Sequence, residues 1–526
     1  MVPQCLNRNW QFQLGSKDAA WQTVQLPHDY SILQPRAPEA RTLSSGGFFP
    51  GGNAIYRKTL YVPSAWRDKR IVLEFEGVYM NAEVRVNDHF ACLHPYGYTS
   101  FHCDISGLVH YGVDNVITVS VANDAAPNSR WYSGSGIYRP VWLMVGEPLH
   151  IQPWGVYVTT PDVAADAARV HVATELKNSG DMLYAATLET SVLNGQGRVV
   201  AQSQTAAAVD VGACITVEQD LQVASPALWS VDDPALYTLH SQVVYDGRVV
   251  DEARTTFGIR SLCFSFTDGF RLNGQSIKLK GGCVHHDCGL VGAAAYARAE
   301  ERKVELLKKS GYNAIRTAHN PPSPAMLEAC DRLGMLVLDE AFDCWRDGKN
   351  PYDYHAVFAT WWKEDLASMV RRDRNHPCVI LWSTGNEILE RDGHSDGYRL
   401  ARELADAVRA LDPTRPVTNA VCGLWRDDPD DDWAKLTAPF IEPLDVVGYN
   451  YLWQRYEADA QRFPGRIIMG TESFPMEAFD NWDIIGRMDN VIGDFVWTSW
   501  DYFGEAGIGM TVDQLEQPVE KYELGA

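Results

Sequence analysis

NAIRTAHNPPSPAMLEACDRLGMLVLDE (313–340) decides the fold class of this chain. It begins with a short apolar run, NAIRTA (313–318), and ends with another, MLVLDE (335–340), and both runs favour buried strands. Between them, Ser323 and the proline after it can begin a helix, and Gly334 stands where that helix would end. A strand, a helix and a strand in this order form the repeating unit of a parallel α/β sheet.

The same alternation continues on both sides of this unit, from about residue 261 to the end of the chain. Eight apolar runs are candidate strands: SIKLKGGCV (276–284), NAIRTA (313–318), MLVLDE (335–340), CVILWS (378–383), PVTNAV (416–421), DVVGYN (445–450), RIIMGT (466–471) and VIGDFVW (491–497). Eight such units predict a (β/α)8 TIM barrel over residues 261–526. The last segment, GMTVDQLEQPVEKYELGA (509–526), is a poor helix candidate, so we expect the closing helix to be missing or incomplete.

The sequence before the barrel has a different period. Residues 1–147 contain short alternating runs such as IVLEFEGV (71–78) and NVITVSVAND (115–124), which predict an antiparallel β-sandwich. Residues 148–260 repeat the pattern, for example in ARVHVATEL (168–176), and predict a second, immunoglobulin-like β-sandwich. We therefore expect a multidomain chain with two β domains and one α/β domain.

Composition excludes several classes of partner. The chain has 526 residues and a formal net charge of −22, so nucleic acid and anionic membranes are disfavoured partners. No apolar run is long enough to cross a bilayer, and the N-terminus does not resemble a signal peptide. Eleven irregularly spaced cysteines fit reduced, buried thiols better than a disulfide framework, which predicts a cytoplasmic protein. The composition is also compatible with a homo-oligomer.

Two glutamates follow predicted barrel strands. Glu387 stands in LWSTGNEIL (381–389), after the fourth strand, and Glu472 in IIMGTESF (467–474), after the seventh. The carboxyl ends of the strands form the active-site face of such a barrel, so the two carboxylates should face each other. A lone glutamate in this position more commonly forms an ion pair, but a pair can cleave a glycosidic bond. A separation of about 5–5.5 Å would give retention of configuration.

Several motifs resemble those of glycoside hydrolase family 2, and the resemblance covers essentially the whole chain. The motifs are LPHDY (26–30), RWYSGSGIYRPVWL (130–143), RTAHNPP (316–322), DEAF (339–342), GNE (385–387), GTES (470–473) and VWTSWDYFGEAGIG (496–509). The resemblance implies a jelly-roll sugar-binding domain, an immunoglobulin-like domain and a catalytic TIM barrel. It also implies a double-displacement mechanism, with Glu387 as general acid/base and Glu472 as nucleophile.

The resemblance assigns further residues around these carboxylates. Asn386 would hold the 2-hydroxyl of the sugar, Tyr451 would donate a hydrogen bond to Glu472, and Arg316 would keep Glu472 ionised. Tyr451 and Arg316 could otherwise be ordinary core or salt-bridge residues.

More distant contacts with the sugar follow from the same resemblance. His285 and His319 match histidines placed around the sugar, and Trp497 matches a tryptophan beneath its ring, although Trp497 could also be a core residue. Asp124, at the end of a strand in the first sandwich, matches an aspartate that reaches the far hydroxyls. The first domain would then form part of the site.

We expect no metal and no other cofactor. GGCVHHDCG (281–289) has the composition of a zinc site, but alternation along a strand would send His286 to the face opposite Cys283 and His285. Some family β-galactosidases bind magnesium after the third strand. Here that segment is DEAFDCWRDG (339–348), in which Cys344 and Arg346 are poor magnesium ligands.

The expected substrate is a carbohydrate with a terminal β-D-galactosyl residue, because the GTES and WDYFGEAGIG motifs resemble those of β-galactosidases most. A β-glucuronidase or β-galacturonidase is an alternative, although the family's Asn and Lys pair for the sugar carboxylate is not found here. A non-catalytic carbohydrate-binding protein with an incomplete barrel is another. Pro475 stands where some members have a sugar-contacting histidine, which affects the expected sugar preference.

Overall fold

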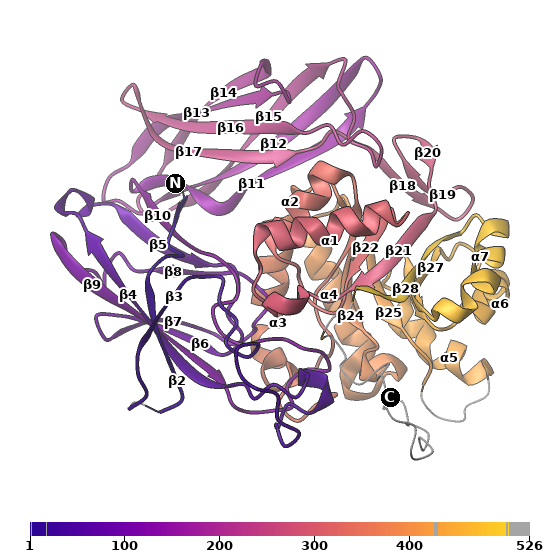
Figure 1. The fold of residues 1–526 in the computed structure, drawn as a ribbon. Coiled ribbons are helices and arrows are strands. Elements are labelled where there is room, and N and C mark those ends of the chain that lie inside the picture. The colour runs from indigo at the N-terminus through magenta and orange to yellow at the C-terminus, as the bar shows by residue number, and fades with distance from the viewer. Residues whose placement is uncertain (2, 17, 425–429, 501–502, 504–526) are drawn as a thin grey trace.

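The computed structural model describes the whole chain except residues 2, 17, 425–429, 501–502 and 504–526. Two β-sandwiches and a closed eight-stranded barrel follow one another along the chain. Figure 1 shows both sandwiches lying beside the barrel, whose strands and helices run from pink through orange to yellow. The predicted fold class is therefore confirmed.

The first sandwich has a four-stranded sheet in the order β1-β10-β5-β8 and a six-stranded sheet in the order β3-β2-β4-β9-β6-β7. Alternating side chains of β9 are buried, because successive residues of a strand point to opposite faces. The strands are β1 (Pro3–Cys5), β2 (Trp10–Leu14), β3 (Gln22–Val24), β4 (Gly52–Val62), β5 (Arg70–Phe75), β6 (Ala82–Val86), β7 (His89–His94), β8 (Phe101–Asp104), β9 (Val113–Asn123) and β10 (Val141–Gly146).

The second sandwich packs a three-stranded sheet, β11-β12-β15, on a four-stranded sheet, β14-β13-β16-β17. Its core consists mainly of aliphatic side chains from the two inner faces. The strands are β11 (Leu149–Val163), β12 (Ala167–Asn178), β13 (Tyr184–Leu193), β14 (Val199–Val209), β15 (Cys214–Ala224), β16 (Tyr237–Tyr245) and β17 (Arg248–Phe257). A small sheet, β18-β19-β20, precedes the barrel and consists of β18 (Leu262–Ser265), β19 (Gly269–Leu272) and β20 (Gln275–Ser276).

All eight predicted barrel strands form, and they pair in sequence order to close the ring. Each neighbouring pair is parallel, so the carboxyl ends of the strands meet at one face of the barrel. The strands are β21 (Leu279–Val284), β22 (Ala314–Thr317), β23 (Leu336–Glu340), β24 (Val379–Asn386), β25 (Val417–Val421), β26 (Val447–Asn450), β27 (Ile468–Ser473) and β28 (Val491–Trp500).

Helices connect these strands as the sequence predicts. Ser323 caps α2 by accepting a hydrogen bond from the backbone N–H of Met326, and Gly334 ends α2 in the left-handed conformation (φ 71°). The helices are α1 (Ala297–Lys309), α2 (Pro324–Leu333), α3 (His355–Asp373), α4 (Gly397–Leu411), α5 (Asp430–Ile441), α6 (Tyr456–Arg462) and α7 (Ala478–Arg487). Short 3-10 turns are η1 (Ser44–Gly46), η2 (Ser64–Trp66), η3 (Gly289–Val291), η4 (Leu389–Asp392), η5 (His394–Asp396), η6 (Trp453–Arg455) and η7 (Pro475–Glu477). The expectation about the closing helix concerns residues outside the described part of the chain.

The first sandwich is fixed to the barrel by buried hydrogen bonds. The hydroxyl of Tyr96 donates to the carbonyl of Ala341 (2.6 Å), and Arg139 Nη2 donates to the carbonyl of Pro321 (2.9 Å). Thr99 donates to Asp365 of α3 at 2.6 Å. Since buried polar groups are costly to leave unpaired, these bonds specify how the two domains fit together.

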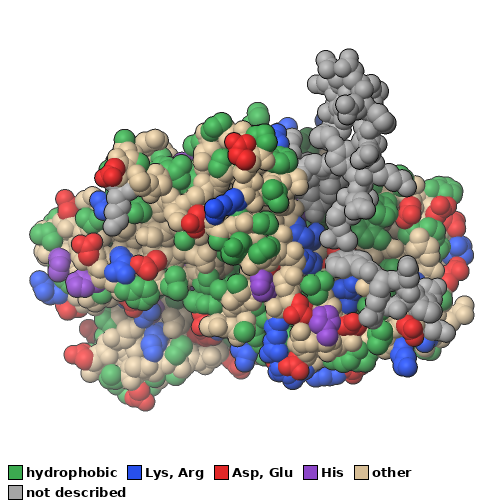
Figure 2. Space-filling view, turned by 90° about the horizontal axis from the view of Figure 1, so that it is seen from below, with side chains coloured by type: hydrophobic (Ala, Val, Ile, Leu, Met, Phe, Trp, Pro, Cys, Tyr) green, Lys and Arg blue, Asp and Glu red, His purple; other side chains and the backbone are tan. Residues whose placement is uncertain are grey.

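The surface carries charges of both signs. Figure 2 shows acidic and basic side chains interspersed on one face of the molecule. Within the described residues, no helix is both long enough and apolar enough to cross a membrane.

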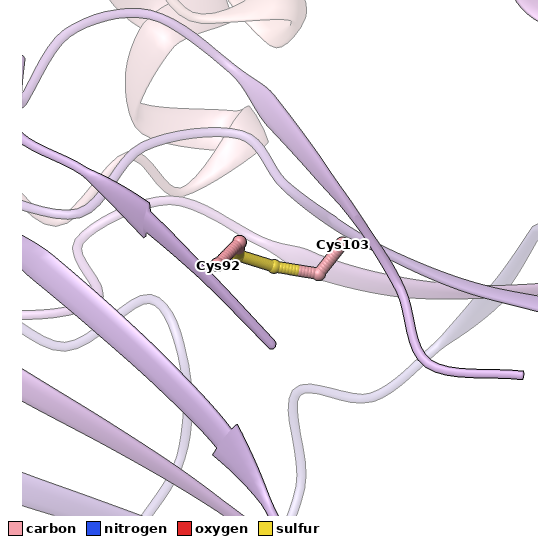
Figure 3. The surroundings of a disulfide bond; sticks show 2 residues. All are labelled: Cys92 and Cys103. Carbon is pink, nitrogen blue, oxygen red and sulfur yellow. A yellow bond between two sulfur atoms is a disulfide. The ribbon is translucent and has the colours of Figure 1, made fainter. Parts of the chain in front are cut away.

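The cysteine prediction is only partly correct. Cys92 and Cys103, on the facing sheets of the first sandwich, form a disulfide (Figure 3), so reduced thiols are the wrong prediction for this pair. The other nine cysteines are free, as expected, but Cys5, Cys214 and Cys263 are exposed rather than buried. A sequence with no regular cysteine spacing gives no sign of which two strands will bring sulfur atoms together.

Candidate active site

Both glutamates lie at the carboxyl-end face of the barrel. Glu387 directly follows β24, and Glu472 is the second-last residue of β27. Glu472 is buried. Burial raises the pKa of Glu472 to about 7, against the lowering effect of Arg316, and the charge of Glu387 adds to the increase. The two carboxylates are therefore close enough to influence each other electrostatically.

Arg316 on β22 connects the residues around these carboxylates. Its Nη1 donates to Oε1 of Glu472 at 2.7 Å, and its Nη2 donates to Oδ1 of Asn386 at 2.8 Å. Its Nε and Nη2 also bind Glu340 at 3.0 and 2.8 Å. All four side chains are buried, so these charged hydrogen bonds are shielded from water.

Glu340, the last residue of β23, is a member of the site for which the sequence predicted no role. Its carboxylate also accepts a hydrogen bond from the hydroxyl of Ser383 (2.7 Å) and lies 2.8 Å from Nδ1 of His319. Burial and Arg316 hold the pKa of His319 well below its usual range, so its imidazole is neutral. The DEAF motif marked Glu340, but only the fold shows that it shares Arg316 with Glu472.

Asn450, at the end of β26, joins the two halves of the site. Its Nδ2 donates to Oε1 of Glu387 and to Oδ1 of Asn386, both at 3.1 Å. Thr471 fixes the orientation of this amide by donating to Asn450 Oδ1 at 2.7 Å. No role was predicted for Asn450 from the sequence, although this residue stands next to Tyr451 in the motif DVVGYNY (445–451).

Tyr451 binds Glu472 through both its side chain and its backbone. Its hydroxyl hydrogen-bonds to the carboxylate of Glu472, and its backbone N–H donates to the carbonyl of Glu472 at 2.7 Å. Burial, together with the charge of Glu472, raises the pKa of Tyr451 well above its usual range. The phenol therefore keeps its proton and acts as a donor.

Glu387 and Tyr451 have left-handed backbones, with φ of 43° and 57°. Each is the residue directly after a barrel strand, β24 and β26. This conformation is uncommon for residues other than glycine, and such strain is concentrated at functional sites. In both cases the surrounding hydrogen bonds hold the residue in place.

Aromatic and imidazole rings line the site beside the carboxylates. Trp497 of β28 stacks on His319 with ring centroids 5.1 Å apart, and His285, after β21, stacks on Trp131 at 5.3 Å. Nδ1 of His285 lies 2.8 Å from the carbonyl of Ala318, and among the described residues its buried Nε2 has no hydrogen-bond partner. Trp131 belongs to the first sandwich, which therefore contributes to the wall of the site.

A charged cluster from two domains supports Asn386. Arg130 of the first sandwich binds Asp343 through Nε (2.9 Å) and Nη2 (2.7 Å), and Lys349 Nζ lies 2.9 Å from the same carboxylate. Asn386 Nδ2 donates to Asp343 at 3.1 Å, and Lys349 donates to the backbone carbonyl of Asn386 at 3.0 Å. Although burial opposes ionisation, Arg130 and Lys349 hold the pKa of Asp343 well below its usual range.

The structure thus brings together eight of the nine residues singled out in the sequence. They are Glu387, Glu472, Asn386, Arg316, Tyr451, His285, His319 and Trp497. The ninth, Asp124, is exposed directly after β9, and it is not part of the hydrogen-bond network described above. Its neighbour Asn123 is buried and donates to Ser135 at 2.6 Å within the first sandwich.

The two segments considered for metals have other partners. In GGCVHHDCG (281–289), the Sγ of Cys283 donates to the carbonyl of Thr471, and Nε2 of His286 lies 3.2 Å from the carbonyl of Ser133. Arg346, in the segment after the third strand, binds the exposed Asp396 at 2.9 Å. Cys283, His286 and Arg346 thus each have a partner within the protein.

Three family models match the chain in succession. They are described as Glycosyl hydrolases family 2, sugar binding domain (residues 6–147), Glycosyl hydrolases family 2 (149–260), and Glycosyl hydrolases family 2, TIM barrel domain (266–434). The three matches follow the order of the two sandwiches and the barrel.

The curated relatives include proteins named β-galactosidase and proteins named β-glucuronidase. The chain is 36% identical to the β-galactosidase BoGH2A of Bacteroides ovatus, over 95% of this chain and 68% of that protein. It is 30% identical to a β-glucuronidase of Bacteroides fragilis, over 79% of this chain and 60% of that protein. Other curated relatives are matched over about half of their length.

Solved structures show the same arrangement of domains. A glycosyl hydrolase family 2 member from Bacteroides cellulosilyticus superposes with a TM-score of 0.92 at 46% identity, over 97% of this chain and 66% of that one. A β-glycosidase from Bacteroides vulgatus superposes with a TM-score of 0.84 at 30% identity, over 96% of this chain and 71% of that one.

Proposed function

Because this chain belongs to glycosyl hydrolase family 2, we propose that it is a retaining β-glycosidase that removes terminal β-D-galactosyl residues from a carbohydrate. The observation that carries the proposal is the pair of strand-end carboxylates with different surroundings. Glu472 is buried between Arg316 and Tyr451, whereas Glu387 receives one amide hydrogen bond from Asn450.

In the first step, Glu472 would attack the anomeric carbon while Glu387 donates a proton to the leaving oxygen. Arg316 and Tyr451 donate hydrogen bonds to Glu472, and both favour its ionised form. Burial and the negative charge of Glu387 oppose ionisation. With a pKa of about 7 the carboxyl group is partly ionised at neutral pH, and its ionised form is poorly solvated, which favours attack on the sugar.

In the second step, Glu387 would remove a proton from water, and that water would release the sugar from Glu472. Two displacements at the same carbon restore its original configuration. Asn450 donates a hydrogen bond to one carboxylate oxygen of Glu387 at 3.1 Å. The left-handed backbone of Glu387 sets the direction in which its side chain leaves the main chain. Glu387 can therefore serve both steps from one position.

Asn386 would hold the 2-hydroxyl of the sugar. Its Oδ1 accepts from Arg316 and Asn450, and its Nδ2 donates to Asp343. An amide held on both sides is already oriented before substrate binds, so contacts that strengthen in the transition state need little rearrangement. His285, His319 and Trp497 would surround the remainder of the sugar ring. Asp124 would contact the hydroxyl groups of the sugar that lie farthest from the carboxylates.

A galactoside is favoured over a uronide because the cations described around the site, Arg316, Arg130 and Lys349, are all engaged by carboxylates. A uronic acid requires a positive or amide group for its carboxylate. Arg130 and Lys349 both bind the half-buried Asp343. The relative BoGH2A, which matches 95% of this chain, is named a β-galactosidase.

The test compares aryl β-galactoside, β-glucuronide and β-galacturonide as substrates for the wild type, Glu472→Ala and Glu387→Ala. We expect the galactoside to have the highest kcat/KM in the wild type and both variants to lose activity. A higher kcat/KM for a uronide would contradict the sugar assignment alone. Equal turnover by wild type and Glu472→Ala would contradict the nucleophile, and binding of galactose without any turnover would favour a non-catalytic binding protein.

A further inference from the structure

A cavity of about 250 Å³ lies where the second sandwich meets the barrel. It is lined by residues of β11, by the segment after β17 and by loops that precede β24 and β25. Those loops enter the amino ends of the strands. The cavity is therefore at the opposite end of the barrel from Glu387 and Glu472, and the proposed glycosidase chemistry does not use it.

Three arginines line this cavity: Arg260, Arg374 and Arg415. Arg260 comes from the link between the second sandwich and the barrel, and the other two come from the barrel. Among the described residues, neither Arg260 nor Arg374 forms a salt bridge. Arg415 forms a salt bridge with Asp412 at 2.6 Å, and the same carboxylate accepts hydrogen bonds from Tyr157, Trp382 and Thr414.

The guanidinium groups are held in place by backbone carbonyls and aromatic rings. Arg260 donates through Nε to the carbonyl of Pro377 (2.6 Å) and through Nη2 to that of Val379 (2.8 Å). Arg415 donates through Nε to the same carbonyl of Val379 at 2.7 Å. Arg374 lies 4.3 Å above the ring of Tyr157. The contacts of Arg260 and Arg374 fix these guanidinium groups without neutralising their charge, whereas Arg415 is paired with Asp412.

The positive charge of the cavity is only partly compensated, because Asp412 pairs with Arg415 whereas Arg260 and Arg374 have no salt bridge among the described residues. Burial, followed by repulsion from Arg415, lowers the pKa of Arg260 to about 9. Burial and repulsion from Arg371 also lower the pKa of Arg374. Nη1 of Arg260 has no hydrogen-bond partner in the described part of the chain, although the other two nitrogens of this side chain do. An anion in the cavity would relieve the repulsion between the arginines. It could also accept a hydrogen bond from Nη1 of Arg260.

The neighbouring group Asp331, His376 and Cys378, whose ligand atoms lie within 4.8 Å of one another, is already linked by internal hydrogen bonds. Asp331 already accepts from the backbone N–H of Cys378 (3.0 Å) and contacts Nδ1 of His376. The adjacent Arg260 and Arg415 repel a metal ion.

We propose that this cavity binds a tetrahedral oxyanion, either free phosphate or sulfate or the phosphate group of a small metabolite. Guanidinium groups pair with such oxyanions through paired N–H donors. The cavity exceeds the size of a single phosphate, so it has room for ordered water or for a small ester group. Because its arginines come from both sides of the junction, the anion would hold the second sandwich against the barrel.

The experiment measures thermal unfolding of the full chain in phosphate, sulfate, glucose 6-phosphate and chloride at equal ionic strength. The variants are Arg260→Gln and Arg374→Gln, and the control is Arg248→Gln, which removes an exposed arginine from β17. We expect a saturable increase in Tm of about 2 °C or more with an oxyanion for the wild type and the control. The increase should be lost in Arg260→Gln and reduced in Arg374→Gln. Galactosidase activity without oxyanion should not change.

A direct titration followed by calorimetry distinguishes the two sources of the anion. A stronger response to glucose 6-phosphate than to phosphate identifies an ester ligand, and the reverse identifies the free ion. An increase in Tm no larger than that in chloride, or equal in wild type and Arg260→Gln, would overturn the proposal. If Arg260→Gln does not fold, Arg374→Gln and the wild-type titration decide between the same outcomes.

Discussion

Arg316 Nη1 lies 2.7 Å from Oε1 of Glu472, and both side chains are buried. The same guanidinium binds Glu340 and Asn386, so one cation serves two carboxylates and the amide proposed to hold the 2-hydroxyl. Because removing one partner of a buried ion pair leaves an uncompensated charge, the ionisation of Glu472 depends on Arg316.

Glu472→Gln should reduce kcat for an aryl β-galactoside by a factor on the order of 10³ or more, because the amide cannot form the glycosyl intermediate. Stopped assays of product measure the loss. A 2-deoxy-2-fluoro galactosyl fluoride should label the wild type at Glu472, as peptide mass spectrometry would show. Labelling of another residue would move the nucleophile assignment there.

The same substitution should stabilise the protein at high pH. The pKa of Glu472 rises on folding from its ordinary value to about 7, so the folded state binds a proton more tightly than the unfolded state. The wild type therefore loses stability as the pH rises between these two values, by an amount on the order of 3 kcal/mol. Glu472→Gln removes this loss. The Tm of Glu472→Gln minus that of the wild type should be larger at pH 8 than at pH 4.5. The same difference in Tm at both pH values would contradict the raised pKa of Glu472.

Glu387→Ala should lower kcat/KM by about 10²–10⁴-fold for substrates with poor leaving groups, and by less for activated aryl galactosides. Azide should restore turnover of the activated substrate, because it needs no deprotonation by Glu387. The product should be the β-galactosyl azide, identified by NMR. An α-azide would be incompatible with a retaining mechanism.

Arg316→Gln should move the acid limb of the kcat/KM profile to higher pH by about one unit or more, because a neighbouring cation lowers the pKa of a carboxyl group by that amount. Arg316→Lys keeps the charge and should shift the limb less. The pH profiles of both variants are compared with that of wild type. An acid limb that stays in place in Arg316→Gln would mean that another group is responsible for it.

Asp343→Asn should reduce kcat/KM by about 10-fold or more, because Asn386 would lose a charged partner that is itself held by Arg130 and Lys349. If Asp343 acts through the contact of Asn386 with the 2-hydroxyl, the loss should be much smaller for a 2-deoxy-galactoside. Asp396→Asn, which removes an exposed carboxylate, is the control. Equal losses for both substrates would indicate only a structural role.

Local patterns predicted most of the fold because each barrel strand is a continuous apolar run with turn residues around it. The run NAIRTA (313–318) became β22, and Ser323 and Gly334 begin and end the following helix as expected. The first strand shows the limit of the pattern. SIKLKGGCV (276–284) suggested nine residues, but β21 begins at Leu279 because Gln275 and Ser276 pair with β19.

The site could be predicted only where its residues adjoin a strand motif. Glu387 and Glu472 come after such runs, whereas the role of Asn386 was predicted only from the family resemblance. Asn450, Asp343 and Arg130 were missed as site residues because their roles depend on contacts between segments far apart in the sequence. The disulfide between Cys92 and Cys103 was missed for the same reason, since the sulfur atoms meet across two sheets. Periodicity describes neighbours along the chain, and it carries no information on such pairings.

The contribution of Arg130 and Trp131 to the barrel limits how this protein can be recombined with its relatives. Arg130 binds Asp343, and Trp131 stacks on His285, so a short loop of the first sandwich completes the pocket of another domain. A chimera that exchanges the barrel at the boundary near residue 261 would combine one parent's loop with the other parent's Asp343 and His285. A barrel grafted onto this sandwich therefore needs residues that match Arg130 and Trp131.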